Sequence, residues 1–201
     1  DRWLVTGWND KAVRLWEVES GKLVRTWDQR GDWVGAVEFS PDSKSIMVTD
    51  LGGGISLIDL ETGQERILGK LDRSIWSVAA APDGKSVVTG DENGELTFWD
   101  LPSGSIARVI KAHSLQVGLL VFSADGRYLL SGSADRSAAI FEAATGREHR
   151  RLIGHQGAVW AGAFSADGTL VITGDNEGET RLWDTDYQAF TVRVCERLNA
   201  V

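Results

Sequence analysis

Short apolar runs separated by polar turns recur along the whole chain. The runs SVVTG (86–90), YLLSG (128–132) and LVITG (170–174) are rich in residues that favour strands. Each is followed by a polar turn such as DENGE or SADRS, and then by a second apolar run such as LTFWD or TRLWD. A glycine turn and a further short run complete each copy. The pattern predicts four short antiparallel strands per copy, joined by tight turns that leave no room for a long helix.

Two markers show that these copies form a true repeat. The Asp of the turns FSPD (39–42), AAPDG (80–84) and FSADG (122–126 and 164–168) recurs every 41 or 42 residues. A large apolar residue followed by an acid recurs with the same step at 16–17, 58–59, 99–100, 141–142 and 183–184. A single four-stranded sheet cannot bury both of its faces, so neighbouring copies must stack, and stacking around an axis gives a propeller.

The chain resembles the WD-repeat β-propeller family at its FSADG turns, its Thr-Gly or Ser-Gly dipeptides, its Gly154-His155 pair and its closing Trp-Asp pairs. The resemblance implies an all-β propeller of four-stranded antiparallel blades, with about five blades present and the first incomplete. We expect a partial propeller over residues 1–185, with blades at about 1–28, 32–69, 73–111, 115–153 and 157–185. We expect the remainder of the ring to come from upstream residues or from another chain.

Residues 186–201 depart from the repeat. Tyr187, Phe190, Val194 and Leu198 lie at helical spacing, which predicts a helical C-terminal tail; an extended outer strand over 189–194 is the alternative. The tail also resembles the segment that follows the propeller in bacterial multidomain WD-repeat proteins, at Val194-Cys195, Arg197 and Asn199. That resemblance implies that the chain is the C-terminal propeller part of a larger bacterial protein.

In the WD-repeat family, each complete blade buries a hydrogen-bonded tetrad of His, Ser or Thr, an acid and Trp. Carried over by position, the resemblance assigns His155, Thr173, Glu177 and Trp183 in the last blade, and His113, Ser131 and Asp135 in the blade before it, with Phe141 replacing Trp. It assigns Thr89, Asn93 and Trp99 in the third blade, Thr6, Asp10 and Trp16 in the first, and no network in the second. Because the sets recur, we expect them to be structural rather than a catalytic triad or a metal site.

Composition narrows the functional classes. The net charge of −8 argues against nucleic acid or an anionic membrane as partner, since both require clustered Lys and Arg. No apolar run approaches the ~20 residues of a membrane span. The single cysteine, Cys195, excludes a disulfide framework within the chain and fits a reducing, cytoplasmic location. Phosphate-loop and dinucleotide motifs are absent. We therefore expect no catalytic residues, no metal and no cofactor.

The nine tryptophans suggest where function lies. The resemblance implies that the face bearing the tetrad turns binds partners, and its positions here hold Trp33, Trp76, Gln116, Trp160, Asn9 and Asn176. Exposed Trp is a typical interface anchor. The sequence therefore predicts a non-enzymatic scaffold that binds other proteins and, through the tail, the sensor or regulatory propeller of a larger bacterial protein. The alternative is a small-ligand or glycan-binding propeller, which clustered Trp and acidic turns would also serve.

Overall fold

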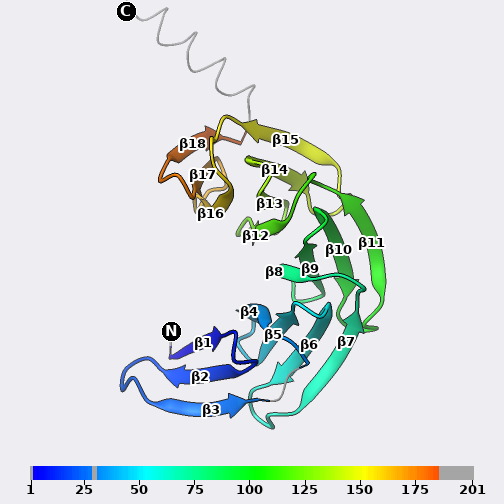
Figure 1. Ribbon diagram of the computed structural model, residues 1–201, viewed down its shortest axis with the longest axis vertical. Coiled ribbons are helices and arrows are strands. Elements are labelled where there is room, and N and C mark those ends of the chain that lie inside the picture. The colour runs from blue at the N-terminus through cyan, green and yellow to red at the C-terminus, as the bar shows by residue number, and fades with distance from the viewer. Residues whose placement is uncertain (1, 29–30, 186–201) are drawn as a thin grey trace, which may run out of the picture.

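The computed structural model describes residues 2–28 and 31–185, and every regular element among them is a β-strand (Figure 1). The strands form five antiparallel sheets, so the predicted all-β fold of WD-repeat-like blades is confirmed. The expected helical tail over 186–201 lies outside the described residues. Within the described ranges, no helix is long and apolar enough to cross a membrane.

Three sheets have four strands each, in chain order from the inner strand to the outer one. The second sheet contains β4 (Val34–Phe39), β5 (Ser45–Asp50), β6 (Gly54–Asp59) and β7 (Glu65–Lys70). The third contains β8 (Ile75–Ala80), β9 (Ser86–Asp91), β10 (Glu95–Asp100) and β11 (Ile106–Lys111). The fourth contains β12 (Val117–Phe122), β13 (Tyr128–Ser133), β14 (Ser137–Glu142) and β15 (Glu148–Ile153).

The first and fifth sheets have three described strands each. The first contains β1 (Trp3–Gly7), β2 (Val13–Glu17) and β3 (Leu23–Trp27). Its described strands include no counterpart of the inner strand, because β1 corresponds in the repeat to β5. The fifth contains β16 (Val159–Phe164), β17 (Leu170–Asp175) and β18 (Thr180–Asp184).

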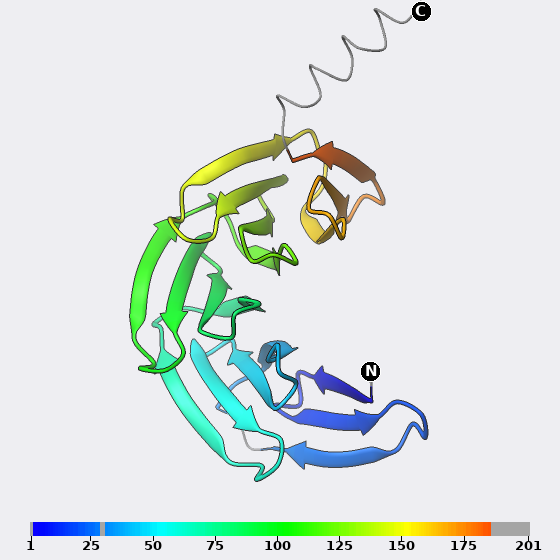
Figure 2. The same ribbon diagram turned by 180° about the vertical axis from the view of Figure 1, so that it is seen from behind.

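The five sheets follow one another around an arc, with β4, β8, β12 and β16 nearest its centre (Figures 1 and 2). Neighbouring inner strands contact one another. The approach is close enough that a Cβ added at Gly35 would lie 2.0 Å from the carbonyl oxygen of Ile75. Both views place the first and fifth sheets at opposite ends of the arc.

The core lies between consecutive sheets rather than inside any one of them. Trp99 of the third sheet is 2% exposed and packs with Met47 and Ile55 of the second sheet. Phe141 and Trp183 fill the same place at the next two interfaces. Each sheet thus covers its predecessor, and the buried apolar area provides the main stabilisation.

Arginines on the outer strands of the second, third and fourth sheets bind each of these sheets to the one that follows it. Arg66 on β7 donates a hydrogen bond to the carbonyl oxygen of Leu101 at 2.7 Å, and Arg108 on β11 donates to that of Ala144 at 2.7 Å. Arg150 on β15 donates to the carbonyl oxygen of Asp184. These arginines recur every 42 residues, and the sequence analysis missed them because charged residues on outer strands usually face only water.

The packing predicts opposite outcomes for two leucines. Leu130 is fully buried between the fourth and fifth sheets, whereas Leu182 is 66% exposed on the face of the fifth sheet that points away from the fourth. Leu130→Ala should lower the free energy of unfolding by about 2–5 kcal/mol, since it leaves a cavity. Leu182→Ala should change it by less than about 0.5 kcal/mol. Urea unfolding followed by Trp fluorescence measures both, and equal losses would contradict the assigned interface.

Candidate functional site

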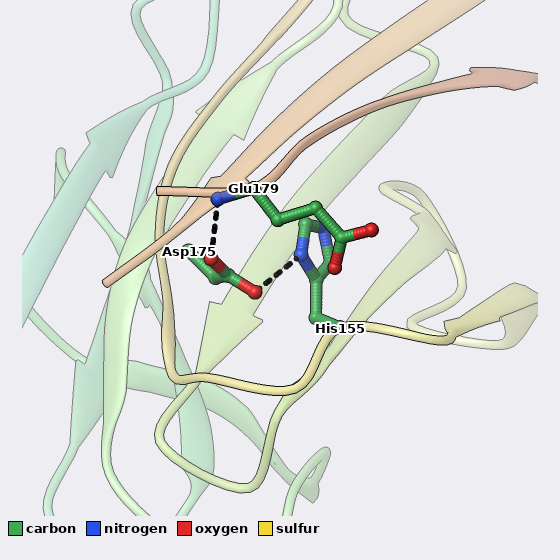
Figure 3. Close-up of side chains that lie close together, drawn as sticks. All are labelled: His155, Asp175 and Glu179. Atoms are coloured by element: carbon green, nitrogen blue, oxygen red, sulfur yellow. Dashed lines mark hydrogen bonds and ion pairs between the residues drawn. The ribbon is translucent and has the colours of Figure 1, made fainter. Parts of the chain in front are cut away.

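The fifth sheet holds the most complete tetrad. His155 precedes β16, and its ring is buried. Its Nε2 lies 2.7 Å from Thr173 Oγ1, and Trp183 Nε1 donates to the same hydroxyl oxygen at 2.7 Å. His155 Nδ1 lies 2.9 Å from the Oδ2 atom of Asp175 (Figure 3). The chain of bonds joins the loop before β16 to β17 and β18, so it fixes three segments of the sheet at once.

The acid of this tetrad is Asp175, and the assignment of Glu177 is wrong. Glu177 is exposed in the turn and contributes only its backbone N–H, which donates to Asp175 Oδ1 at 3.1 Å. Asp175 ends β17, from which its short side chain reaches both the imidazole and the turn amides. The sequence held a signal for it: Asp50 and Asp91 also end the second strand of their sheets.

Hydrogen bonding keeps Asp175 ionised. Burial alone would raise the pKa of its carboxyl group, but the bonds from Glu179 N and His155 outweigh burial and lower the pKa to about 2. The carboxylate therefore accepts from the turn and from the imidazole at neutral pH.

In the fourth sheet the same network forms with an acid that lies two positions later in the repeat than Asp175 does in the fifth. His113 Nε2 lies 2.7 Å from Ser131 Oγ, and Nδ1 lies 3.0 Å from Asp135 Oδ2. The strand-end position holds Ser133, whose hydroxyl accepts the Asp135 N–H at 3.1 Å. Burial lowers the pKa of His113, which favours a neutral imidazole. Phe141 offers no donor, so this set ends at Ser131.

Arginine replaces histidine in the third sheet, which the sequence analysis missed. Trp99 Nε1 donates to Thr89 Oγ1 at 3.0 Å, but Leu71 stands at the histidine position. Arg73, two residues later, donates from Nε to Asp91 Oδ2 at 2.6 Å. Its Nη2 donates to Glu95 Oε2 at 2.8 Å. Asn93 contributes only its backbone N–H to the Asp91 carboxylate, at 2.9 Å.

The first sheet keeps one bond of the tetrad. Trp16 Nε1 donates to Thr6 Oγ1 at 3.0 Å. Asp10 is not joined to this pair; its carboxylate instead accepts hydrogen bonds from the Arg14 side chain, at 3.2 and 2.5 Å. In the second sheet, the positions of the tetrad hydroxyl and Trp hold Val48 and Ile58, which are fully buried apolar residues with no side-chain donor or acceptor.

One group in the described part of the chain has the donor atoms of a metal site. The ligand atoms of His155, Asp175 and Glu179 lie within 4.8 Å of one another. Figure 3 shows the Glu179 side chain beside the imidazole ring. His155 Nδ1 is engaged by Asp175, however, and Glu179 pairs with Arg181 Nη2 at 2.7 Å. The arrangement therefore favours a structural network, since a cation would have to break the tetrad.

The tetrads hold one face of the arc in place. In the second to fifth sheets, the turn after the second strand donates a backbone hydrogen bond to the loop that leads into the inner strand. Examples are Leu51 N to Trp33 O at 2.9 Å and Asn176 N to Ala158 O at 3.0 Å. The Asn176 side chain adds a bond from Ala158 N to its Oδ1 at 2.8 Å. We call the surface formed by these turns and loops the tetrad face.

The tetrad face exposes large aromatic side chains. Trp33 is 47% exposed, Trp76 37% and Trp160 38%. Trp8, in the turn between β1 and β2, is 62% exposed; the sequence alone did not decide its role. Trp160 also packs against Gly118, because a Cβ added there would lie 2.4 Å from its ring.

The remaining predicted positions differ in exposure. Asn9 and Asn176 are exposed, whereas Gln116 is half-buried. Leu115, beside Gln116, is 52% exposed on this face. The sequence analysis missed Leu115 because a leucine in a loop gives no signal of its orientation.

Comparison with known proteins identifies the repeat. The model of the family described as "WD domain, G-beta repeat" matches residues 65–100, 104–142 and 146–184. The chain belongs to the WD-repeat family. Each matched WD repeat runs from the outer strand of one sheet through the third strand of the next. A WD repeat therefore links two sheets covalently.

Relatives match over short segments only. A ribosome biogenesis protein BOP1 homolog from Drosophila mojavensis is 34% identical over 71 residues, which is 35% of this chain and 9% of the relative. Eukaryotic translation initiation factor 3 subunit I from Phaeosphaeria nodorum is 42% identical over 52 residues, 25% of this chain and 15% of the relative. That subunit from Lodderomyces elongisporus is 49% identical over 43 residues, 21% of this chain and 12% of the relative. These relatives are eukaryotic, and WD repeats imply an interaction scaffold that is generally non-enzymatic.

The corrected tetrad acid can be tested by pH. Because the pKa of Asp175 is lowered to about 2 in the folded protein, its stabilisation is present above the ordinary value of 3.8 and is lost as pH falls towards 2. Asp175→Asn should therefore be less stable than wild type at pH 6, with the difference shrinking between pH 4 and pH 2. Urea unfolding at each pH measures it.

Glu177→Gln is the matched control. Its stability should follow that of the wild type at every pH, because the Glu177 side chain lies outside the network. If Glu177→Gln showed the pH-dependent difference and Asp175→Asn did not, the original assignment would stand.

Proposed function

We propose that this chain is a non-enzymatic scaffold that binds another protein through the tetrad face. The observation that carries the proposal is the group of exposed indoles at the entry of the inner strands. Large aromatic rings exposed on a soluble protein are uncommon and are the side chains that most often anchor an interface. The backbone hydrogen bonds between the turns and the entry loops favour a preformed surface, which reduces the entropy cost of binding.

A narrower form of the proposal makes the chain the sensor or regulatory propeller of a larger bacterial protein, working in the cytoplasm. It rests on the resemblance at Val194-Cys195, Arg197 and Asn199, which lie outside the described residues. The relatives reported above are eukaryotic, so they add no support to this form.

We also propose that the two ends of the arc are covered by further blades or by another chain. Leu4 is 52% exposed on the end face of the first sheet, and Leu182 and Ile172 are 66% and 44% exposed on that of the fifth. At the internal interfaces the corresponding positions are closed by the next sheet. Apolar rows of this kind favour a covering partner.

The experiment is a quantitative pull-down from a cell lysate, with the wild-type chain, Trp76→Ala and Trp160→Ala each used as bait. Mass spectrometry identifies the captured proteins. Both variants should lose the same captured proteins, because they remove the anchors. Their melting temperatures should change by no more than a few degrees, since both rings are more than one third exposed.

Ile106→Ala is the matched control, because Ile106 is 47% exposed at the start of the outer strand β11, at the end of that strand away from the tetrad face. It should retain every captured protein. A large fall in melting temperature for the Trp variants would assign the indoles to packing. Specific signals on a glycan array, lost in the Trp variants, would favour a glycan-binding propeller instead.

A further inference from the structure

The opposite end of the inner strands carries a separate pocket. The inner strands all run in the same sense, so residues near their ends lie away from the tetrad face. Five residues separate Trp33 from Glu38, or about 17 Å along an extended strand. Near the ends of β4, β8 and β12, which Figure 1 shows side by side around the centre of the arc, lies a cavity of about 300 Å³. Three consecutive sheets line it.

The side chains that line the pocket are apolar apart from one carboxyl group and one hydroxyl group, and backbone polar atoms contribute to its surface. The lining residues are Glu38, Phe39, Pro41, Ala80, Pro82, Leu120, Val121, Phe122, Ser123 and Ala124. Ser123 Oγ is already engaged, because it donates to Asp125 Oδ1 at 2.6 Å. Glu38 is thus the one charged residue in the lining.

Glu38 is held in place but has no counter-ion among the described residues. Its Oε2 accepts a hydrogen bond from Ala80 N at 3.0 Å, across the junction between the second and third sheets. Burial raises the pKa of Glu38 to about 7, and no cation offsets the effect. A half-buried carboxylate without a counter-ion is costly, so Glu38 retains an electrostatic attraction for a cation.

Other charged groups at this end of the strands do not line the pocket. The turns that follow β4, β8 and β12 carry Asp42, Lys44, Asp83, Lys85, Asp125 and Arg127. The three aspartates accept hydrogen bonds within their own turns. The net charge of −8 adds to the preference for a cation.

We propose that this pocket binds an alkylguanidinium or alkylammonium group, with the cationic head on Glu38 and the alkyl stem along Phe39 and Phe122. The stem suits apolar walls because long basic side chains bury their methylene groups and keep the charge at a polar partner. The volume is that of a small ligand site. The site is distinct from the tetrad face, so failure of either proposal leaves the other standing.

The first test is a titration with n-butylguanidinium, followed by the amide signals of the protein in two-dimensional NMR. The Ala80 amide should shift saturably, because it donates to the carboxylate that receives the ligand. Glu38→Gln, which keeps an acceptor for that amide, should weaken binding at least tenfold at pH 8. Glu19→Gln, an exposed change of the same charge, should leave the affinity unchanged. Equal binding by Glu38→Gln and wild type would overturn the proposal.

The affinity should also depend on pH with a defined sign. A carboxyl group of pKa about 7 is about nine-tenths ionised at pH 8 and about one-tenth at pH 6, so wild type should bind about tenfold more weakly at pH 6. Glu38→Gln should show no such dependence. Neutral n-butylurea, of the same shape, should bind neither protein measurably; equal affinity for the urea would mean that the cation is irrelevant.

Two further experiments test where the ligand binds and whether it is a protein side chain or a free cation. Ala124→Phe should abolish binding by filling the cavity while Glu38 stays intact, and unchanged binding would put the cation on the surface instead. N-acetylarginine methylamide and a pentapeptide with one central arginine are then compared. Tighter binding of the peptide indicates a protein side chain, and equal binding a free organic cation; absence of binding by both would overturn the proposal.

A fold control separates misfolding from lost binding. Because burial raises the pKa of Glu38 from 4.5 to about 7, the wild type should lose stability as pH rises from 4.5 to 7. Glu38→Gln lacks this loss, so its melting temperature relative to wild type should rise over that range. A variant that melts well above the assay temperature and fails to bind supports the pocket.

Discussion

The structure depends on sheets that are apolar on both faces. Leu130 is fully buried towards the fifth sheet, whereas Phe141 of the same sheet is buried towards the third. If the sheet stood alone, both side chains would remain exposed to water. The stacking of sheets is therefore what folds the chain, and all other features are built on it. The close contact of inner strands at Gly35 and the outer arginine bonds follow from the same stacking.

The polar networks adapt to that stacking rather than direct it. A histidine is fixed by an acid at the strand end in the fifth sheet and by an acid in the turn in the fourth. In the third sheet, Leu71 occupies the histidine position, and Arg73 pairs with the acid instead. The second sheet replaces the network by apolar residues and keeps its four strands. Where a buried histidine or its substitute Arg73 remains, it is paired with an acid, because an unpaired buried polar group would cost about 1–3 kcal/mol.

The two ends of the inner strands offer different chemistry. The tetrad face presents indoles at the entry of the inner strands, beside loops held by backbone hydrogen bonds, which suits a broad protein surface. The opposite end presents a small apolar pocket with the lone carboxyl group of Glu38. Both arise because every inner strand runs in the same sense, so that equivalent residues of successive repeats gather at one end.

The repeat spacing, strand pattern and turn glycines were enough to predict the class of fold and the number of sheets, because these are local and periodic signals. The tetrad positions were carried over from the resemblance to the WD-repeat family. The sequence did not predict that Asp175 rather than Glu177 meets His155, since the two acids are only two residues apart and the folded geometry alone decides that the acid at the end of β17 reaches the ring. Nor did it indicate Arg73 or the pocket at Glu38. The bond from Ala80 to Glu38 joins residues 42 positions apart in different sheets. Such a contact exists only once the sheets have stacked, so only the tertiary structure decided it.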